Sequence, residues 1–137
     1  MANEAVIVEL LGDRGDVVSY ACADGATIEK GTICILQDNR TASGAIALQT
    51  ATSIAGIAAH EKVSGDGATT IGCYTNGIFD LYTASGGTIT AGTYVCLSGA
   101  NAIRQSALLG DFSGGLIFGR ALETGSVNEV IQVRVIL

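Results

Sequence analysis

The side chains best suited to catalysis in this sequence are one histidine and four cysteines. His60 stands beside Glu61 and has the chemistry of a base, but no nucleophile elbow, zinc-binding histidine pair or phosphate-binding loop accompanies it. The cysteines are spaced by 12, 39 and 23 residues without a Cys-x-x-Cys pair, which argues against a structural zinc site. They are Cys22, Cys34, Cys73 and Cys96. We therefore expect no catalytic residue, no cofactor and no metal site.

Each cysteine also lies in a strand-like run of apolar residues. In such a run a free cysteine behaves as a small buried hydrophobic residue. A disulfide that includes Cys22 or Cys73 is the alternative, and the spacing alone leaves it open.

One acidic loop invites a second chemical interpretation. The segment 63–68 places Asp66 between Gly65 and Gly67. A calcium loop of the EF-hand type needs several carboxylates at alternate positions and a distal glutamate, and a phosphate loop needs a Lys-Ser/Thr pair. Because neither pattern accompanies Asp66, the segment favours a simple turn.

The charge balance argues against nucleic-acid binding. The 137 residues include 7 lysines and arginines against 13 acidic residues, for a net charge of −6. Proteins that bind nucleic acids neutralise phosphates with basic side chains, and here these are scattered singly along the chain. They are Lys30, Lys62, Arg14, Arg40, Arg104, Arg120 and Arg134.

No stretch is typical of export or of a membrane. Residues 1–5 lack the basic region and long apolar core of a signal peptide. No stretch approaches the ~18 uninterrupted apolar residues of a membrane span, and the segment 45–59 is interrupted by polar residues. We therefore expect synthesis in a cytoplasm and no membrane partner.

Charged residues make up only 15% of the chain, against the ~25% typical of soluble domains. One explanation is that alanine, glycine and threonine fill the surface. The other is that much of the surface lies against partner copies, since monomers rarely expose wide apolar patches. Composition leaves both explanations open.

Short runs of β-branched and apolar residues, separated by turn residues at intervals of roughly 8–12, predict an all-β sandwich or barrel. The expected strands are 5–11, 17–22, 32–36, 54–58, 70–74, 78–82, 116–122 and 129–137. Asn76-Gly77 predicts a hairpin between 70–74 and 78–82. The segment 101–109 has room for one short helical turn.

The chain also contains an internal duplication. Residues 17–36 match residues 78–97 at seven of twenty positions, and five of the seven form the shared frame Thr-Ile-x-x-Gly-Thr-x-x-x-Leu. A second block, 54–61, aligns with 117–124. Two copies are too few for a solenoid. We expect an N-terminal arm and first strand in 1–16, followed by one β domain, 17–137, made of tandem repeats 17–77 and 78–137.

The second repeat carries a resemblance to a known family. Its motifs, in order, are Gly77-Ile78-Phe79-Asp80-Leu81, Gly87-Thr88-Ile89-Thr90-Ala91-Gly92-Thr93-Tyr94-Val95, Gly119-Arg120-Ala121-Leu122-Glu123 and Ile131-Gln132-Val133-Arg134-Val135. This order resembles the tailed-phage capsid cement, or head decoration, family, whose members have a G-x-F-x-L strand, an I-x-x-G-x-x-V strand, a G-x-A-L-E strand and a final V-x-V-x-L. The resemblance covers most of 15–137. The chain departs from it in its four cysteines and in the Ser/Thr-rich segment 41–53.

The resemblance implies a small β-barrel or sandwich, β-tulip-like in shape, on the outer surface of an icosahedral phage capsid. It implies a structural virion protein, not an enzyme, that binds the major capsid protein as a homotrimer at capsomer junctions and stabilises the shell. The segment outside the duplication is the expected arm, which extends along the capsid or adds a strand to a neighbour. Its residues are Ala2, Asn3, Glu4, Ala5, Val6, Ile7 and Val8.

Two other functions remain open at this stage. A phage tail or fibre module that binds a cell-surface glycan would show an exposed aromatic cluster near aspartate or asparagine. An enzyme built around His60 or a reactive cysteine would lose turnover when His60 is replaced or the thiols are alkylated.

Overall fold

The computed structural model describes residues 2–12, 15–44, 52–84, 87–106, 111 and 113–137. The elements whose bounds lie entirely within these residues are strands and one short 3-10 helix, η1 (Asp38–Arg40). The strands are β1 (Val6–Glu9), β2 (Val17–Ala21), β3 (Ile33–Gln37), β4 (Thr41–Gly44), β5 (Ile54–Ala58), β6 (Thr70–Tyr74), β7 (Asn76–Thr83), β8 (Tyr94–Leu97), β9 (Ala102–Gln105), β10 (Ile117–Ala121) and β11 (Val130–Ile136).

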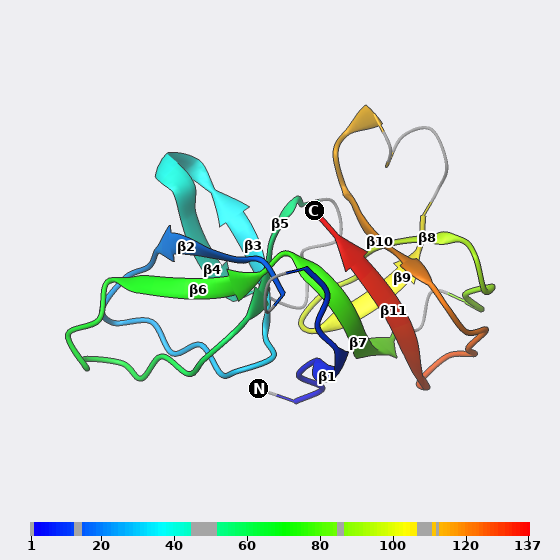
Figure 1. Ribbon diagram of the computed structural model, residues 1–137, viewed down its shortest axis with the longest axis horizontal. Helices are drawn as coiled ribbons and strands as arrows, with labels where there is room; N and C mark the ends of the chain where they lie inside the picture. Colours follow the sequence, from blue (N-terminus) through cyan, green and yellow to red (C-terminus); the bar gives the residue numbers. More distant parts are fainter. Residues whose placement is uncertain (1, 13–14, 45–51, 85–86, 107–110, 112) are drawn as a thin grey trace.

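These strands form two closed barrels, one from each repeat. The first barrel has the order β2-β4-β3-β5-β6 and closes by pairing β6 with β2. The second has the order β7-β11-β10-β8-β9 and closes by pairing β9 with β7. Figure 1 shows the two barrels as separate lobes, with β2–β6 on one side and β7–β11 on the other. The prediction of an all-β barrel built from two tandem repeats is confirmed.

The two barrels share even their irregular pairings. The short parallel contact Ala21↔Thr41 between β2 and β4 recurs as Tyr82↔Ala102 between β7 and β9. The isolated bridge between Ile28 and Lys62 recurs as a bridge between Ile89 and Gly125. The repeat read from the sequence is therefore a repeat of backbone hydrogen bonding as well.

Alternating burial explains why these segments form strands. In β7 the buried side chains of Phe79, Leu81 and Thr83 alternate with partly exposed neighbours. In β11, Val133 and Val135 face the barrel interior and Arg134 faces outward. A period of two side chains places one face in the core and the other at the surface, as predicted for 129–137.

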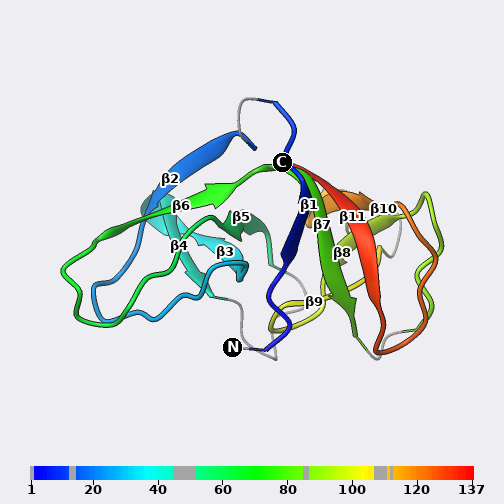
Figure 2. The same ribbon diagram turned by 60° about the horizontal axis from the view of Figure 1, so that its bottom comes forward.

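One apolar cluster joins the barrels. It contains the interior of the second barrel, including Phe79 and Phe118, together with Ile33 and Ile57 from the first. Ala5, from the segment before β1, belongs to the same cluster. Figure 2 shows β1, β7 and β11 side by side, with β1 on the side of the first barrel. The first barrel also has a smaller interior cluster of its own.

The predicted hairpin at Asn76-Gly77 is wrong. Both residues belong to β7, and β6 and β7 pair with different partners in different barrels. The tight hairpin turn requires positive φ at both central residues, whereas Gly77 has φ 147° and Asn76 does not have a positive φ. Thr75 is the one residue between β6 of the first barrel and β7 of the second.

The short helical turn predicted within 101–109 is wrong where it can be compared. Residues Ala102–Gln105 form β9, which pairs with β8 and β7. Residues 107–109 lie outside the described part of the chain. Among the helices of the described residues, none has the length and apolar character needed to cross a membrane.

Candidate interaction surfaces

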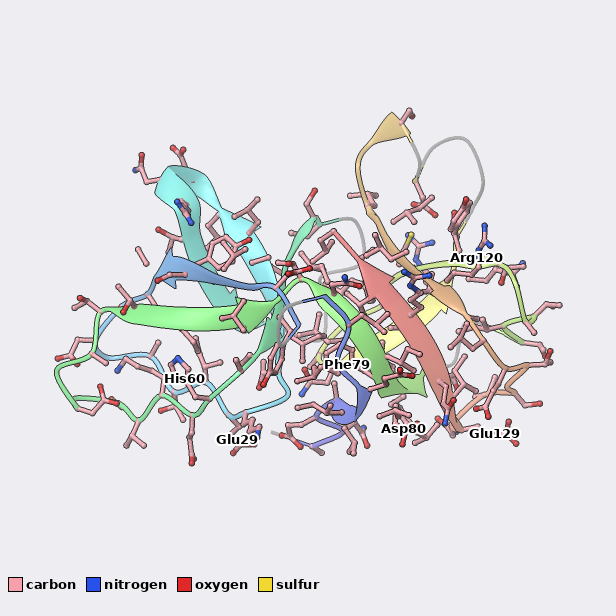
Figure 3. The ribbon with its side chains drawn as sticks, viewed as in Figure 1. Glu29, His60, Phe79, Asp80, Arg120 and Glu129 are labelled. Carbon is pink, nitrogen blue, oxygen red and sulfur yellow. The ribbon has the colours of Figure 1, made fainter. Side chains whose placement is uncertain are left out.

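His60 has a structural role in the first barrel. Its Nε2 accepts a hydrogen bond of 3.0 Å from the backbone N–H of Gly72, and its Nδ1 lies 3.5 Å from the carbonyl oxygen of Glu61. The ring therefore bridges the end of β5 to β6. Figure 3 shows His60 in the first barrel, far from Arg120 in the second.

The four cysteines are buried and carry free thiols. A hydrogen-bonding contact with Cys73, together with burial, raises the pKa of Cys34. Burial raises the pKa of Cys96 to about 11. Because the thiolate is the reactive form, these two side chains are held in their unreactive state at neutral pH.

The loop around Asp66 is closed by a buried lysine. The Nζ of Lys62, which is 1% exposed, donates hydrogen bonds to the Asp66 carboxylate at 2.7 Å and to the carbonyl oxygens of Asp24 and Val63 at 2.7 and 2.9 Å. The Asp66 carboxylate also accepts hydrogen bonds from the backbone N–H groups of Val63 and Ala68. Across the described residues, no group of three or more His, Cys, Asp or Glu side chains is arranged to hold a metal ion.

The predicted arm is tied to both barrels at its beginning. The Ala5 N–H donates to the carbonyl oxygen of Gly31 at 2.7 Å. The buried side chain of Asn101, between β8 and β9, donates to the Ala2 carbonyl at 3.2 Å and accepts a hydrogen bond from the Ile33 N–H at 2.8 Å. Asn101 thus joins the arm, the first barrel and the second. The sequence reasoning missed this residue.

The second half of the arm forms an exposed edge. Among the pairings of the described residues, β1 hydrogen-bonds only to β7, so its other edge is open. Val6 and Val8 are 60% and 43% exposed. Next to them, a groove of about 470 Å³ is lined by arm residues and Lys30.

Two of the scattered arginines come together on the second barrel. Arg120 on β10 lies directly opposite Arg134 on β11 in the antiparallel register. The sequence signal was available in the segments Gly-Arg-Ala and Val-Arg-Val, where each arginine takes the outward position of a strand. The pairing of the two strands, which a single sequence does not provide, was needed to bring the arginines together.

Comparison with known proteins identifies the family. No curated protein matches the chain significantly. The family model described as phage cement protein matches residues 12–137, which is nearly the whole chain. The chain therefore belongs to the phage cement protein family, and its role is that of a structural protein that stabilises a phage capsid.

Proposed function

We propose that this protein binds the outer surface of an icosahedral capsid as a homotrimer, at the junctions between capsomers, where it contacts the major capsid protein. The observation that carries the proposal is the family match over residues 12–137. The surface supports it, because a charge-poor chain presents large apolar side chains to solvent on or next to several strands. These include Val6, Val8, Tyr94, Leu122, Val130 and Ile136.

The proposed mechanism is thermodynamic linkage. A protein that binds the assembled shell and not its dissociated subunits stabilises the shell by mass action. A trimer offers the same contact three times, so weak individual contacts gain strength through effective concentration. This mechanism requires complementary surfaces and no chemistry at any side chain.

The arm, Ala2–Val8, is the proposed contact element for the shell or for a neighbouring subunit. The open edge of β1 offers unpaired backbone groups, which suits the addition of a strand from another chain. The exposed Val6 and Val8 offer apolar area beside that edge. The bonds at Ala2 and Ala5 fix the start of the arm, so β1 is presented in one orientation.

Mixing the purified protein with undecorated shells tests the main proposal. We expect saturable binding, with a copy number per capsomer that matches trimers, and a higher melting temperature of the decorated shell. A protein that ignores the shell but binds members of a glycan array would instead be a tail or fibre module.

The arm is tested by replacing its exposed valines together. Val6→Ser with Val8→Ser should weaken shell binding or trimerisation by at least about tenfold, because two apolar contacts worth roughly 1 kcal/mol each are lost. Val63→Ser, at a residue 54% exposed on the first barrel, is the matched control and should bind normally. Full occupancy and normal trimers in the double variant would contradict the role of the arm.

A further inference from the structure

Two arginines on the second barrel place positive charges opposite each other, in a protein that has few positive charges. Arg120 and Arg134 are directly cross-strand, and both side chains are exposed. Like charges at such positions destabilise a sheet. Only 7 of the 137 residues are lysine or arginine, so two of them are placed where they weaken the fold.

Neither guanidinium is neutralised within the described part of the molecule, where no ion pair includes Arg120 or Arg134. Arg104, by contrast, forms a two-bond ion pair with Asp111 at 2.8 and 3.0 Å. Arg120 lies over the ring of Tyr94, 5.2 Å from its centroid, and its Nη2 donates to the tyrosine oxygen at 3.3 Å. This stacking holds the guanidinium in place and leaves its charge available.

The arginines belong to a groove that also has apolar walls. The groove has a volume of about 470 Å³. Its remaining lining residues are Tyr94, Ile117, Gly119, Leu122 and Ile136. Tyr94, Leu122 and Ile136 are 44%, 42% and 54% exposed, respectively. The surface therefore combines two positive charges with apolar area that is open to solvent, as an interface requires.

The groove follows a row of three cross-strand neighbours, Tyr94, Arg120 and Arg134. The equivalent row in the first barrel consists of Ile33, Ile57 and Tyr74, which pair in the same register. In the first barrel this row is covered by other parts of the molecule. Ile33 and Ile57 are 0% and 1% exposed and pack in the cluster shared with the arm and the second barrel. Tyr74 packs against Phe79 with ring centroids 5.9 Å apart.

The row Tyr94, Arg120 and Arg134 could in principle be covered by the first barrel of a second copy. That arrangement would bring another positive charge to the two arginines. In the covered row, Asn101 reaches Ile33 from the second barrel. The repeat equivalent of Asn101 is Arg40, which has nearly the same backbone φ, 54° against 51°. Docking by the first barrel of another copy would therefore add a third arginine to Arg120 and Arg134. The chemistry favours a partner that carries carboxylates.

We propose that the groove between Tyr94, Arg120 and Arg134 binds an acidic segment of the major capsid protein, the coat protein of the shell. This inference rests on the proposed function and names its contact surface. Aspartate or glutamate side chains of the coat protein pair with the two guanidinium groups, since arginine forms charge-assisted hydrogen bonds with carboxylates. Apolar side chains of the same segment cover Ile117, Leu122 and Ile136.

The test compares shell binding by wild type, Arg120→Gln with Arg134→Gln, and a matched control, Arg40→Gln. The control is suitable because Arg40 lies over the ring of Tyr20, 5.9 Å from its centroid, in the first barrel, and so repeats the stacking of Arg120 on Tyr94. Binding to undecorated shells is measured over a series of salt concentrations. We expect the double variant to bind at least about tenfold more weakly, with a flatter salt dependence, and the control to behave as wild type. Melting of the unbound variants verifies that they fold.

The outcomes separate this inference from the proposed function. If wild type does not bind shells, the cement mechanism itself fails and the docking face fails with it. If wild type and the double variant bind equally, with equal salt dependence, the docking face alone is overturned. If the double variant occupies shells normally but no longer forms trimers, the groove is a contact between copies, which also overturns the inference.

A cross-linking measurement identifies the partner directly. Arg134→Lys introduces an amine at the groove, and a carbodiimide joins an amine to a carboxylate by an amide bond with loss of water. Mass spectrometry of cross-linked decorated shells should find the new lysine joined to an aspartate or glutamate of the coat protein. Cross-links only to other copies of this chain would count against the inference.

Discussion

The two barrels have the same strand pairings but very different interiors. The second barrel is filled by large side chains, including Phe79, Phe118 and Ile103. At equivalent positions the first barrel has small ones, with Ala55 in place of Phe118 and Ala42 in place of Ile103. The comparison shows that the backbone pattern tolerates either filling, because the hydrogen-bonded ladders and not the side-chain volumes are shared.

The barrels also differ in what stabilises their loops. The bridge that joins Ile28 to Lys62 in the first barrel joins Ile89 to Gly125 in the second. The first barrel therefore fills this position with a long side chain whose ammonium group closes the loop at Asp66, while the second uses glycine. At this bridge the first barrel therefore uses the ammonium group of a buried lysine, and the second has no side chain at all.

The largest expected effect comes from one leucine that the repeats share. Leu97 is 1% exposed in the second barrel, whereas its equivalent Leu36 is 42% exposed in the first. Leu97→Ala should lower the free energy of unfolding by about 2–5 kcal/mol, because it opens a cavity in packed surroundings. Leu36→Ala should cost less than about 1 kcal/mol, because little of its environment is lost. Urea denaturation of both variants measures the difference.

Equal losses for the two leucines would contradict the contrast between the barrels. The same denaturation curves address the domain organisation. We propose that 17–137 unfold as one unit, because Ile33 and Ile57 of the first barrel pack into the core cluster of the second. Two separate transitions in Leu97→Ala would show that the barrels are independent.

A smaller effect is expected from the ion pair of the first barrel at low pH. The hydrogen bond from Lys62 lowers the pKa of Asp66 from 3.8 to about 2. Because the folded pKa lies below the unfolded one, the contribution of this pair is complete above about pH 4 and is lost as the pH falls towards 2. Asp66→Asn should therefore lower the urea midpoint at neutral pH and flatten its fall between about pH 5 and about pH 2.

Asp80→Asn, which removes a carboxylate from the outer face of β7, is the control for the change in net charge. An unchanged acid dependence in Asp66→Asn would mean that the ion pair contributes nothing to the first barrel.

The smallest effect should have the opposite sign. Arg134→Gln in the unbound protein should raise the free energy of unfolding by a few tenths of a kcal/mol, since it removes repulsion from Arg120. The gain should shrink in high salt, which screens exposed charges. Thermal melting at low and high salt measures it, and a loss of stability at low salt would show that Arg134 makes a favourable contact in the fold.

The strand positions were predictable because they depend on local patterns. Residues 54–58 and 70–74 were expected as strands and are β5 and β6, since β-branched residues between turn signals favour strands. The hairpin at Asn76-Gly77 was wrong because the turn signal is local, while the partners of β6 and β7 are decided by which barrel each strand closes. Only one of the two candidate surfaces could be predicted from local patterns. The arm was recognised as lying outside the repeat, but the meeting of Arg120 and Arg134 was not foreseen.

The sequence by itself determined the strand composition, the duplication and the family, because each is recorded in residue types and their order. Only the tertiary structure decided that each repeat closes its own barrel, that Leu36 is exposed while Leu97 is buried, and that Asn101 joins the arm to both barrels. The physical reason is that the burial of a side chain, and the distance between two charges, depend on contacts between residues far apart in the chain. Two identical leucines in identical frames differ only in what the rest of the molecule packs against them.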